Sequence, residues 1–249
     1  MTIREYLRAG SVEEALEAAK GKRNVVLGGG TWLRLEDRAA ATAIDLSGLG
    51  LDTIEETQDA FSIGAMVTLR AMEKHPGLQE ATHGLCAASV SHIVGVQFRA
   101  CATVGGSVWG RFGFSEVLTA LMALGARLEL ARGGELPIER FACMKPDDDI
   151  LLRVIVPKGV LGAGMQSLRV QETDFPVLTA AAVRRADGLR LCVGARPGRA
   201  ACLAGDDAQT LITRAQTELT YDDNARASAA YRRHLAGVLS RRALEEACK

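Results

Sequence analysis

Three consecutive glycines follow a short apolar run near the start of the chain, in the stretch VVLGGGTWL at residues 25–33. Glycines in a row permit backbone conformations and close approaches that any side chain would block. Consecutive N–H groups without neighbouring Cβ atoms also form a concave array that binds anionic oxygens, phosphates above all. Residues 28–31 are therefore either an anion-binding loop or a tight structural turn.

A second glycine-rich segment, TVGGS at residues 103–107, lies in the middle of the chain. The common phosphate motifs do not fit the first segment. A Rossmann loop requires glycine at position 33, where Leu33 stands, and a Walker loop requires Gly-Lys where Leu33 and Arg34 stand. Two loops from one domain can grip the long diphosphate of a dinucleotide, so the pair of segments favours a dinucleotide ligand.

Composition limits the class of protein. The 249 residues are 48% hydrophobic and carry 30 basic and 30 acidic side chains, which argues against disorder, nucleic-acid binding and membrane-surface binding. The N-terminus has no apolar stretch of signal-peptide length, and no segment reaches the roughly 18 uncharged apolar residues of a membrane span. We expect a soluble cytoplasmic protein with two modest domains.

The cysteines and histidines do not have the spacing of metal ligands. No C-x-x-C pair occurs, so neither a zinc site nor an iron–sulfur cluster is expected. Reduced core thiols are the prediction for the cysteines. The residues concerned are Cys86, Cys101, Cys143, Cys192, Cys202 and Cys248, with His75, His83, His92 and His234.

The first part of the chain mixes helices and strands. Ser11 and Glu14 form a capping-box pattern, so a helix begins there. Strands are expected at 24–27, 42–46 and 61–68, helices at 69–74 and 78–92, and a long loop at 95–113.

The second part of the chain begins with mixed elements and becomes mainly β-strand after residue 157. A buried helix at 115–126, a hairpin across Gly133 and Gly134, and a strand at 150–156 precede a connector at 158–164. Strands at 167–171, 177–184 and 189–194 suggest an antiparallel sheet, and a helix at 224–248 ends the chain. We place the domain boundary near residue 161, which gives domains 1–160 and 161–249.

The two glycine segments carry a family resemblance. In the xanthine dehydrogenase and carbon monoxide dehydrogenase family of molybdenum hydroxylases, the FAD-binding medium subunit has A-G-G-T/S after a strand. A later R-N-x-A-T-I-G-G-N opens a loop that ends with S-D and a helix. This sequence resembles that pattern with LGGGT at 27–31, RACATVGGS at 99–107 and Ser115-Glu116. The similarity continues through nearly all 249 residues.

The resemblance implies an α+β fold: a two-subdomain FAD-binding domain of the vanillyl-alcohol-oxidase (PCMH) type, then a small C-terminal α+β domain with an antiparallel sheet. It implies FAD as cofactor. The partners would be a molybdenum-cofactor catalytic subunit and a [2Fe-2S] subunit, with electrons passing through FAD to NAD+ or another acceptor. No nucleic acid, membrane, metal or catalytic side chain is implied. A scaffold subunit with a degenerate flavin site and a free-standing flavin oxidoreductase are the alternatives.

The resemblance also implies the cofactor-binding residues. Gly28–Thr31 would present N–H groups and a hydroxyl to the FAD phosphates, and Thr103–Gly106 would close from the other side. The full set is Leu27, Gly28, Gly29, Gly30, Thr31, Trp32, Thr103, Gly105, Gly106, Ser107, Ser115, Glu116, Leu151 and Arg169.

Several of these positions depart from the family or have a structural alternative. Trp32 replaces an Asp and either packs over the cofactor or anchors the loop in the core. Ser107 replaces an Asn. Glu116 replaces an Asp and is either a cofactor ligand or the first acid of a helix capped by Ser115. Leu151 is a cofactor contact or a core leucine, and Arg169 lies near the flavin or on the surface. Arg111–Phe114 depart most from the family, which has small residues and Pro there.

Overall fold

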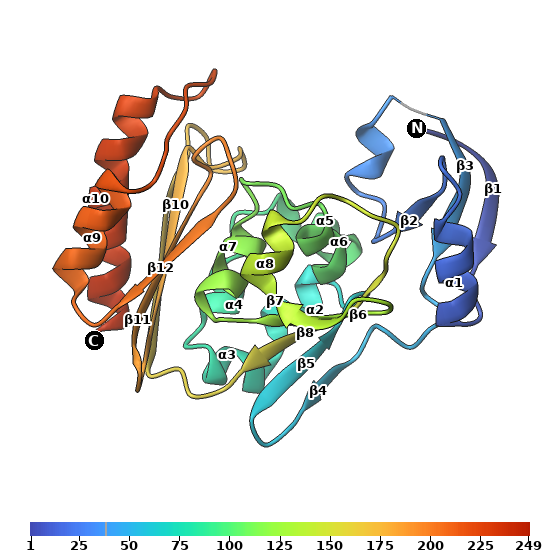
Figure 1. Cartoon of the computed structure of the whole chain (residues 1–249), viewed down its shortest axis with the longest axis horizontal. Helices are drawn as coiled ribbons and strands as arrows, with labels where there is room; N and C mark the ends of the chain where they lie inside the picture. The colour runs from blue at the N-terminus through green and yellow to red at the C-terminus, as the bar shows by residue number, and fades with distance from the viewer. Residues whose placement is uncertain (38) are drawn as a thin grey trace.

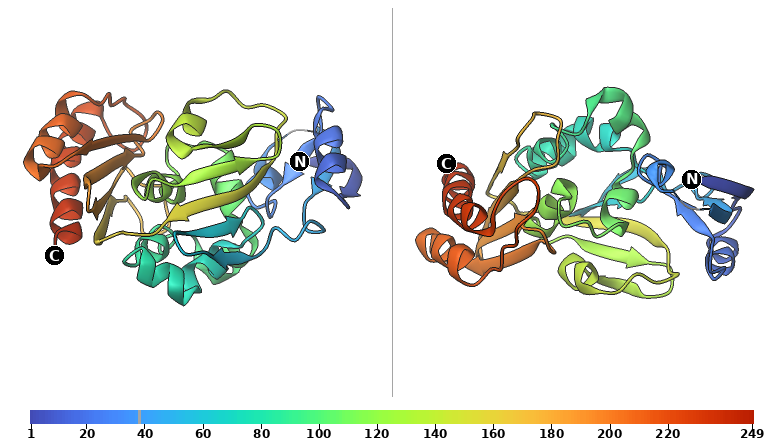
Figure 2. Two further views of the ribbon diagram at one scale, coloured as in Figure 1. Left: turned by 60° about the horizontal axis from the view of Figure 1, so that its bottom comes forward. Right: turned by 90° about the horizontal axis from the view of Figure 1, so that it is seen from above.

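A computed structural model describes residues 1–37 and 39–249. Three sheets follow one another along the longest axis of the molecule (Figure 1). A small parallel sheet contains the N-terminus, a five-stranded sheet with most of the short helices lies in the middle, and a four-stranded sheet backed by two helices contains the C-terminus. The two views of Figure 2 show the same order, with the termini at opposite ends.

The N-terminal sheet is parallel with strand order β1-β3-β2. Its elements are β1 (Thr2–Arg8), α1 (Val12–Ala19), β2 (Val25–Leu27), the 3-10 helix η1 (Leu33–Leu35) and β3 (Ala39–Asp45). The predicted cap is present, because Ser11 Oγ accepts the Glu14 N–H at 3.1 Å. Strand β1 was not predicted, since its side chains are nearly all exposed and leave no alternating apolar pattern.

The central sheet is antiparallel with strand order β4-β5-β8-β6-β7. Its strands are β4 (Ile54–Glu56), β5 (Ala60–Gly64), β6 (Arg127–Leu130), β7 (Gly134–Pro137) and β8 (Leu151–Pro157). The helices of this region are α2 (Leu69–Lys74), α3 (Pro76–Ala81), α4 (Leu85–Ala88), α5 (Gly95–Cys101), α6 (Val104–Trp109), α7 (Glu116–Ala123) and α8 (Ile138–Cys143). Helix α7 is buried at every position, as its apolar spacing predicts.

Two sequence predictions in this region are wrong. Residues 95–113 are not one long loop, because they form α5 and α6. Thr103 caps α6 and its residues Val104 and Val108 are fully buried, so packing outweighs the poor helix propensity of glycine. Residues 78–92 are not one helix either, because positive φ angles at His83 (49°) and Gly84 (76°) separate α3 from α4.

The C-terminal sheet is antiparallel with strand order β12-β11-β10-β9. Its elements are β9 (Gly162–Leu168), β10 (Leu178–Arg185), β11 (Gly188–Gly194), β12 (Ala201–Gly205), α9 (Ala208–Thr217) and α10 (Ala229–Ala247). The predicted connector at 158–164 is wrong in its second half, where β9 already runs. A Cβ at Gly162 would lie 2.1 Å from the Ala247 carbonyl oxygen, so this glycine serves close contact between β9 and α10 rather than a flexible link. Strand β12 and helix α9 were not predicted.

The C-terminal sheet is buried on both faces. In β10, Ala180 and Ala182 belong to the core shared with α9 and α10, whereas Ala181 and Val183 belong to the core of the central region. This alternation follows from the two-residue period of a strand. The sheet therefore joins the C-terminal helices to the rest of the molecule.

The cysteines depart from the prediction of reduced core thiols. Cys192 and Cys202 face each other on β11 and β12, with Cα atoms 4.1 Å apart, and form a disulfide. Of the remaining four, Cys86 is buried and Cys101, Cys143 and Cys248 are exposed.

No helix within residues 1–37 and 39–249 has the length and apolar character needed to cross a membrane.

Candidate functional site

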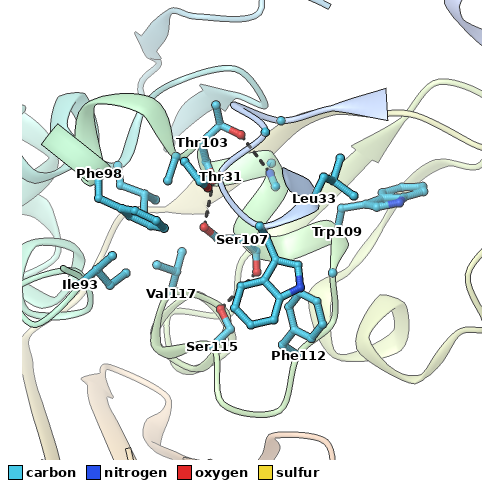
Figure 3. A pocket seen from close by; sticks show the side chains of 18 of the residues that line it. Thr31, Leu33, Ile93, Phe98, Thr103, Ser107, Trp109, Phe112, Ser115 and Val117 are labelled. Atoms are coloured by element: carbon cyan, nitrogen blue, oxygen red, sulfur yellow. Dashed lines mark hydrogen bonds between the residues drawn. The ribbon is translucent and has the colours of Figure 1, made fainter. Parts of the chain in front are cut away.

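The two glycine segments meet in space. A Cβ at Gly28 would lie 3.0 Å from the Cα of Gly106 and 3.0 Å from Thr103 Oγ1. The second segment reaches this position because Thr103 caps α6 by accepting the Gly106 N–H at 3.1 Å. Figure 3 shows Thr31, Thr103 and Ser107 gathered on one side of a pocket, with Ile93 and Phe98 on another.

The first glycine loop turns sharply beneath this contact. Gly29 and Gly30 have φ angles of 80° and 68°, in the left-handed region that favours glycine. A Cβ at Gly29 would lie 1.9 Å from the Cys101 carbonyl oxygen, so no larger residue fits. The N–H groups of Gly29, Gly30 and Thr31 donate no hydrogen bond within the described part of the chain. They are available to an anionic ligand.

The second glycine loop has a different role from the one expected. Its N–H groups are already engaged: Val104 donates to the Val67 carbonyl at 2.9 Å, and Gly105 donates to the Ala65 carbonyl at 2.9 Å. The Gly106 N–H is taken by Thr103 Oγ1. The glycines of this segment therefore permit close packing, and the free donors at the site come from Gly29, Gly30 and Thr31.

A cavity of about 510 Å³ opens beside the two loops. Its wall is mainly apolar and comes from all three regions of the fold, including the segment 173–176 between β9 and β10. Every predicted site residue lines this cavity except Gly29 and Arg169. Leu151 lines it while also belonging to the central core. A mostly apolar pocket with a few convergent polar groups is typical of a cofactor site.

Glu116, the first residue of α7, and Arg169, which directly follows β9, form a buried ion pair. Their side chains are only 7% and 6% exposed. Burial raises the pKa of the Glu116 carboxyl, and the charge of Arg169 opposes that shift. Arg169 also donates to Ser167 Oγ at 2.6 Å. The Glu116 carboxylate is thus paired with a residue of the protein. Arg169 does not line the cavity itself but contacts Glu116, which does.

Ser115 and Ser107 tie the helix α7 to the second glycine loop. Ser115 Oγ accepts the Leu118 N–H at 3.2 Å, which makes it the cap of α7. The same hydroxyl donates to the Ser107 carbonyl at 3.1 Å, and Ser107 Oγ donates to the Thr103 carbonyl at 2.9 Å. Both serines line the cavity while holding its wall in place.

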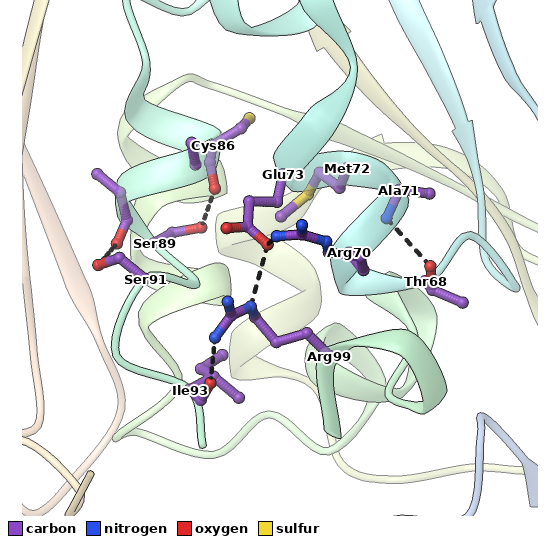
Figure 4. Close-up of polar contacts among 12 residues, drawn as sticks. Thr68, Arg70, Ala71, Met72, Glu73, Cys86, Ser89, Ser91, Ile93 and Arg99 are labelled. Atoms are coloured by element: carbon purple, nitrogen blue, oxygen red, sulfur yellow. Dashed lines mark hydrogen bonds and ion pairs between the residues drawn. The ribbon is translucent and has the colours of Figure 1, made fainter. Parts of the chain in front are cut away.

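A second polar network supports the part of the cavity wall that contains Ile93 and Phe98 (Figure 4). Glu73 accepts from Arg70 at 2.9 Å and from Arg99 at 3.0 Å. Arg99 also donates to the Ile93 carbonyl at 2.6 Å. Burial acts to raise the pKa of the Glu73 carboxyl, but the hydrogen bonds and charges of the two arginines outweigh it and hold that pKa below its ordinary value. The network fixes the segment that carries Ile93, Val94 and Phe98 to the cavity.

Much of the apolar wall was not predicted from the sequence. The additional lining residues include Ile93, Val94, Phe98, Trp109, Phe112, Phe114 and Phe175. Phe112 and Phe114 could have been expected at the site, because residues 111–114 depart from the family pattern. Phe175 gave no signal, because only the packing of the segment between β9 and β10 brings it to the cavity.

Comparison with known proteins identifies the family. Residues 2–159 match the family model described as the FAD binding domain in molybdopterin dehydrogenase. The chain belongs to this family. FAD, the cofactor implied by the sequence resemblance, is therefore confirmed as the cofactor of the family. The resemblance to molybdenum hydroxylase flavin subunits is likewise confirmed.

A relative of this FAD-binding family member matches nearly the whole chain. The uncharacterized protein YgfM of Escherichia coli K12 is 27% identical over 248 residues, which cover 95% of this chain and 93% of that protein.

Solved structures resemble the whole chain as well. A carbon monoxide dehydrogenase chain from Hydrogenophaga pseudoflava has a TM-score of 0.86 at 22% identity, covering 98% of this chain and 96% of that chain. A chain of quinoline 2-oxidoreductase from Pseudomonas putida 86 has a TM-score of 0.84 at 20% identity, with the same coverage. These likenesses confirm the predicted fold.

The residues present fit FAD. The free N–H groups of Gly29, Gly30 and Thr31 suit the anionic oxygens of its diphosphate. The apolar and aromatic wall suits its planar rings. No side chain larger than hydrogen could replace Gly29 without striking Cys101, which explains the bare backbone at this point.

Proposed function

We propose that the chain is the FAD-binding electron-transfer subunit of a xanthine-dehydrogenase-like molybdenum hydroxylase complex. Electrons would come from [2Fe-2S] clusters on a partner subunit and leave to NAD+ or another acceptor. The molybdenum-cofactor subunit of the complex would oxidise the substrate. The contact between the two glycine loops beside one cavity is the observation that carries this proposal.

The residues of this chain would hold and orient the cofactor rather than react themselves. Gly29, Gly30 and Thr31 would donate to the diphosphate, and Thr103 and Gly106 would brace that loop from behind. Bound FAD supplies the ability to take up electrons singly and release them in pairs. The apolar wall would exclude water from the flavin, and the Glu116–Arg169 pair would fix the C-terminal domain against it.

The domain limits belong to the same proposal. We assign 1–160 to the FAD-binding domain and 161–249 to the C-terminal domain. The family match at 2–159 and the start of the C-terminal sheet at Gly162 support this division. A cytoplasmic location stays a prediction from the sequence.

One observation favours the alternative of a scaffold subunit with a degenerate flavin site. The Glu116 carboxylate, which the resemblance assigns to the cofactor, is paired with Arg169 instead. The unpaired N–H groups of Gly29, Gly30 and Thr31 instead favour a working flavin site, because a site that no longer binds FAD would not have to keep these donors open.

Purification and flavin titration separate these possibilities. The chain expressed alone and supplied with FAD should bind one FAD per chain and show the visible absorption of a flavin. Adding the co-purified molybdenum and iron–sulfur subunits with their substrate should then bleach that absorption. A chain that takes up no FAD would overturn the proposal. A flavin that its partner subunits cannot reduce would establish the scaffold function, and steady turnover by the isolated chain would establish a free-standing oxidoreductase.

A further inference from the structure

Three aromatic side chains from two segments form a continuous wall of the cavity. This aromatic wall consists of Trp32 from the first glycine loop and of Phe112 and Phe114 from the segment between α6 and α7. The ring centroids of Trp32 and Phe112 are 5.1 Å apart, and those of Phe112 and Phe114 are also 5.1 Å apart, with the two phenyl planes inclined by 11°. Trp32 and Phe114 are 5.7 Å apart. Such separations are those of interacting rings.

Part of the Trp32 surface in this wall is not covered by other residues of the protein. Trp32 is 37% exposed although its ring contacts three phenyl rings, those of Phe112, Phe114 and Phe175, so it does not anchor the loop in a core. Burial of aromatic surface is favourable, and Trp32 lines the cavity, where a ligand can cover it. A planar ring entering the cavity would find an aromatic surface to pack against.

Arg111 holds the two phenylalanines in place. Its φ angle is 48°, a left-handed conformation that is uncommon for a residue other than glycine. Its Nε donates to the Phe141 carbonyl at 3.2 Å and its Nη1 donates to the Trp109 carbonyl at 3.0 Å. Its guanidinium carbon lies 3.8 Å from the centroid of the Phe141 ring and 4.8 Å from that of Trp109. These contacts make the strained turn before Phe112 persist.

The glycines on either side of Phe112 also fix its position. Gly110 leaves room for Phe112, because a Cβ there would lie 2.4 Å from the Phe112 ring. Gly113 packs against the C-terminal domain, where its carbonyl accepts the Ala195 N–H at 2.6 Å. The segment is thus fixed on both sides of Phe112, and its two rings point to the cavity.

We propose that Trp32, Phe112 and Phe114 pack against a planar ring of the bound cofactor and that Arg111 is the positioning residue of this wall. The inference rests on the proposed function, since FAD is the ligand. FAD offers two such rings, the isoalloxazine and the adenine, and both have the flat aromatic face that the wall would cover.

The test compares FAD binding by variants of the purified full chain. Replacing both Phe112 and Phe114 with Leu should raise the Kd for FAD about tenfold, because each substitution removes an aromatic contact with the ring of the cofactor. Arg111→Ala should raise the Kd by a similar factor. Arg185→Ala is the matched control, because Arg185 also donates to backbone carbonyls, those of Lys158, Leu124 and Pro157, but does not line the cavity. Its Kd should stay within twofold of the wild type.

A second readout reports contact with the wall directly. The chain has two tryptophans, so Trp109→Phe leaves Trp32 as the only indole. Binding of FAD should quench the Trp32 emission, and Arg111→Ala in this background should reduce the quenching at saturating FAD. A merely structural role for Arg111 would change the urea midpoint without changing the quenching of the bound form.

Competition with fragments identifies the ring. If the wall contacts the isoalloxazine, the variant with Leu at positions 112 and 114 should lose affinity for FMN. If the wall contacts the adenine, the same variant should lose affinity for ADP. The inference is overturned if the ring variants and Arg111→Ala bind FAD within twofold of the wild type, or if Arg185→Ala weakens binding equally. A wild-type chain that binds no FAD would instead overturn the proposed function itself and this inference with it.

Discussion

Gly28 and Gly106 are in backbone contact, although they belong to different segments of the chain. A Cβ at Gly106 would lie 2.9 Å from the Gly28 carbonyl oxygen, and a Cβ at Gly28 would lie 3.0 Å from the Gly106 Cα. Neither glycine is required by its own turn, because neither has a positive φ angle. Their role is to let two loops touch, and the touching loops form one side of the cavity.

Replacement of Gly30 by Ala should separate ligand binding from stability. Gly30 lines the cavity with a φ angle of 68°, and nothing of the protein lies within 4 Å of its added Cβ. The left-handed strain should cost about 1 to 2 kcal/mol of unfolding free energy, and a methyl group facing the ligand should raise the Kd for FAD about tenfold. Urea unfolding and FAD titration measure the two effects.

Gly50→Ala is the matched control for that substitution. Gly50 has a φ angle of 66°, equally open space around its Cβ, and no place in the cavity wall. It should lose the same stability as Gly30→Ala while keeping wild-type affinity for FAD. Equal losses of affinity in the two variants, or wild-type affinity in Gly30→Ala, would contradict contact between Gly30 and the ligand.

The network around Glu73 should make stability depend on pH. Because the pKa of Glu73 is held below its ordinary value of 4.5, its contribution is fully present above pH 4.5 and is lost as the pH falls through the lower, folded-state pKa. At pH 7, Glu73→Gln should lower the unfolding free energy by about 1 kcal/mol. The difference from the wild type should shrink steadily as urea titrations are repeated at more acidic pH. A difference that stays constant down to pH 3 would contradict the assigned role of Glu73.

The buried Arg232 should be a main support of the C-terminal domain. It is fully buried and donates to the carbonyls of Val177 at 3.0 Å, Asp222 at 2.7 Å and Ala227 at 2.6 Å. Arg232→Ala leaves these acceptors without a partner and should lower the unfolding free energy by about 3 kcal/mol. The exposed neighbour Arg233 provides the control, and Arg233→Ala should change stability by less than about 0.5 kcal/mol. Similar losses in both variants would refute this assignment.

The cysteine pairing can be counted chemically. With Cys192 and Cys202 joined, the denatured but unreduced protein should show four free thiols, and reduction should raise the count to six. The bond closes a short loop, so reduction should also lower the unfolding free energy by about 2 to 3 kcal/mol. Six thiols before reduction would show that the two cysteines are not bonded in the purified protein.

The sequence was informative where a local signal decides the structure. The caps at Ser11 and Ser115 are present as their side-chain chemistry predicts. The family resemblance identified the fold and FAD, and most of the predicted site residues line one cavity.

Long-range packing explains what the sequence did not predict. Glycines at 105, 106 and 162 suggested loops, yet they lie in a helix or a strand at points where another segment comes too close for a Cβ. Phe175 comes from the C-terminal domain, and the partner of Glu116 is Arg169 of the same domain. Contacts of this kind depend on how the domains pack, which local periodicity does not encode.

A crystal structure of the chain with FAD would show where the diphosphate binds. We predict the FAD diphosphate within hydrogen-bonding distance of the N–H groups of Gly29, Gly30 and Thr31, with the contact between Gly28 and Gly106 preserved behind it. A diphosphate bound elsewhere, with these three N–H groups facing solvent, would show that the first glycine loop is not the phosphate-binding site.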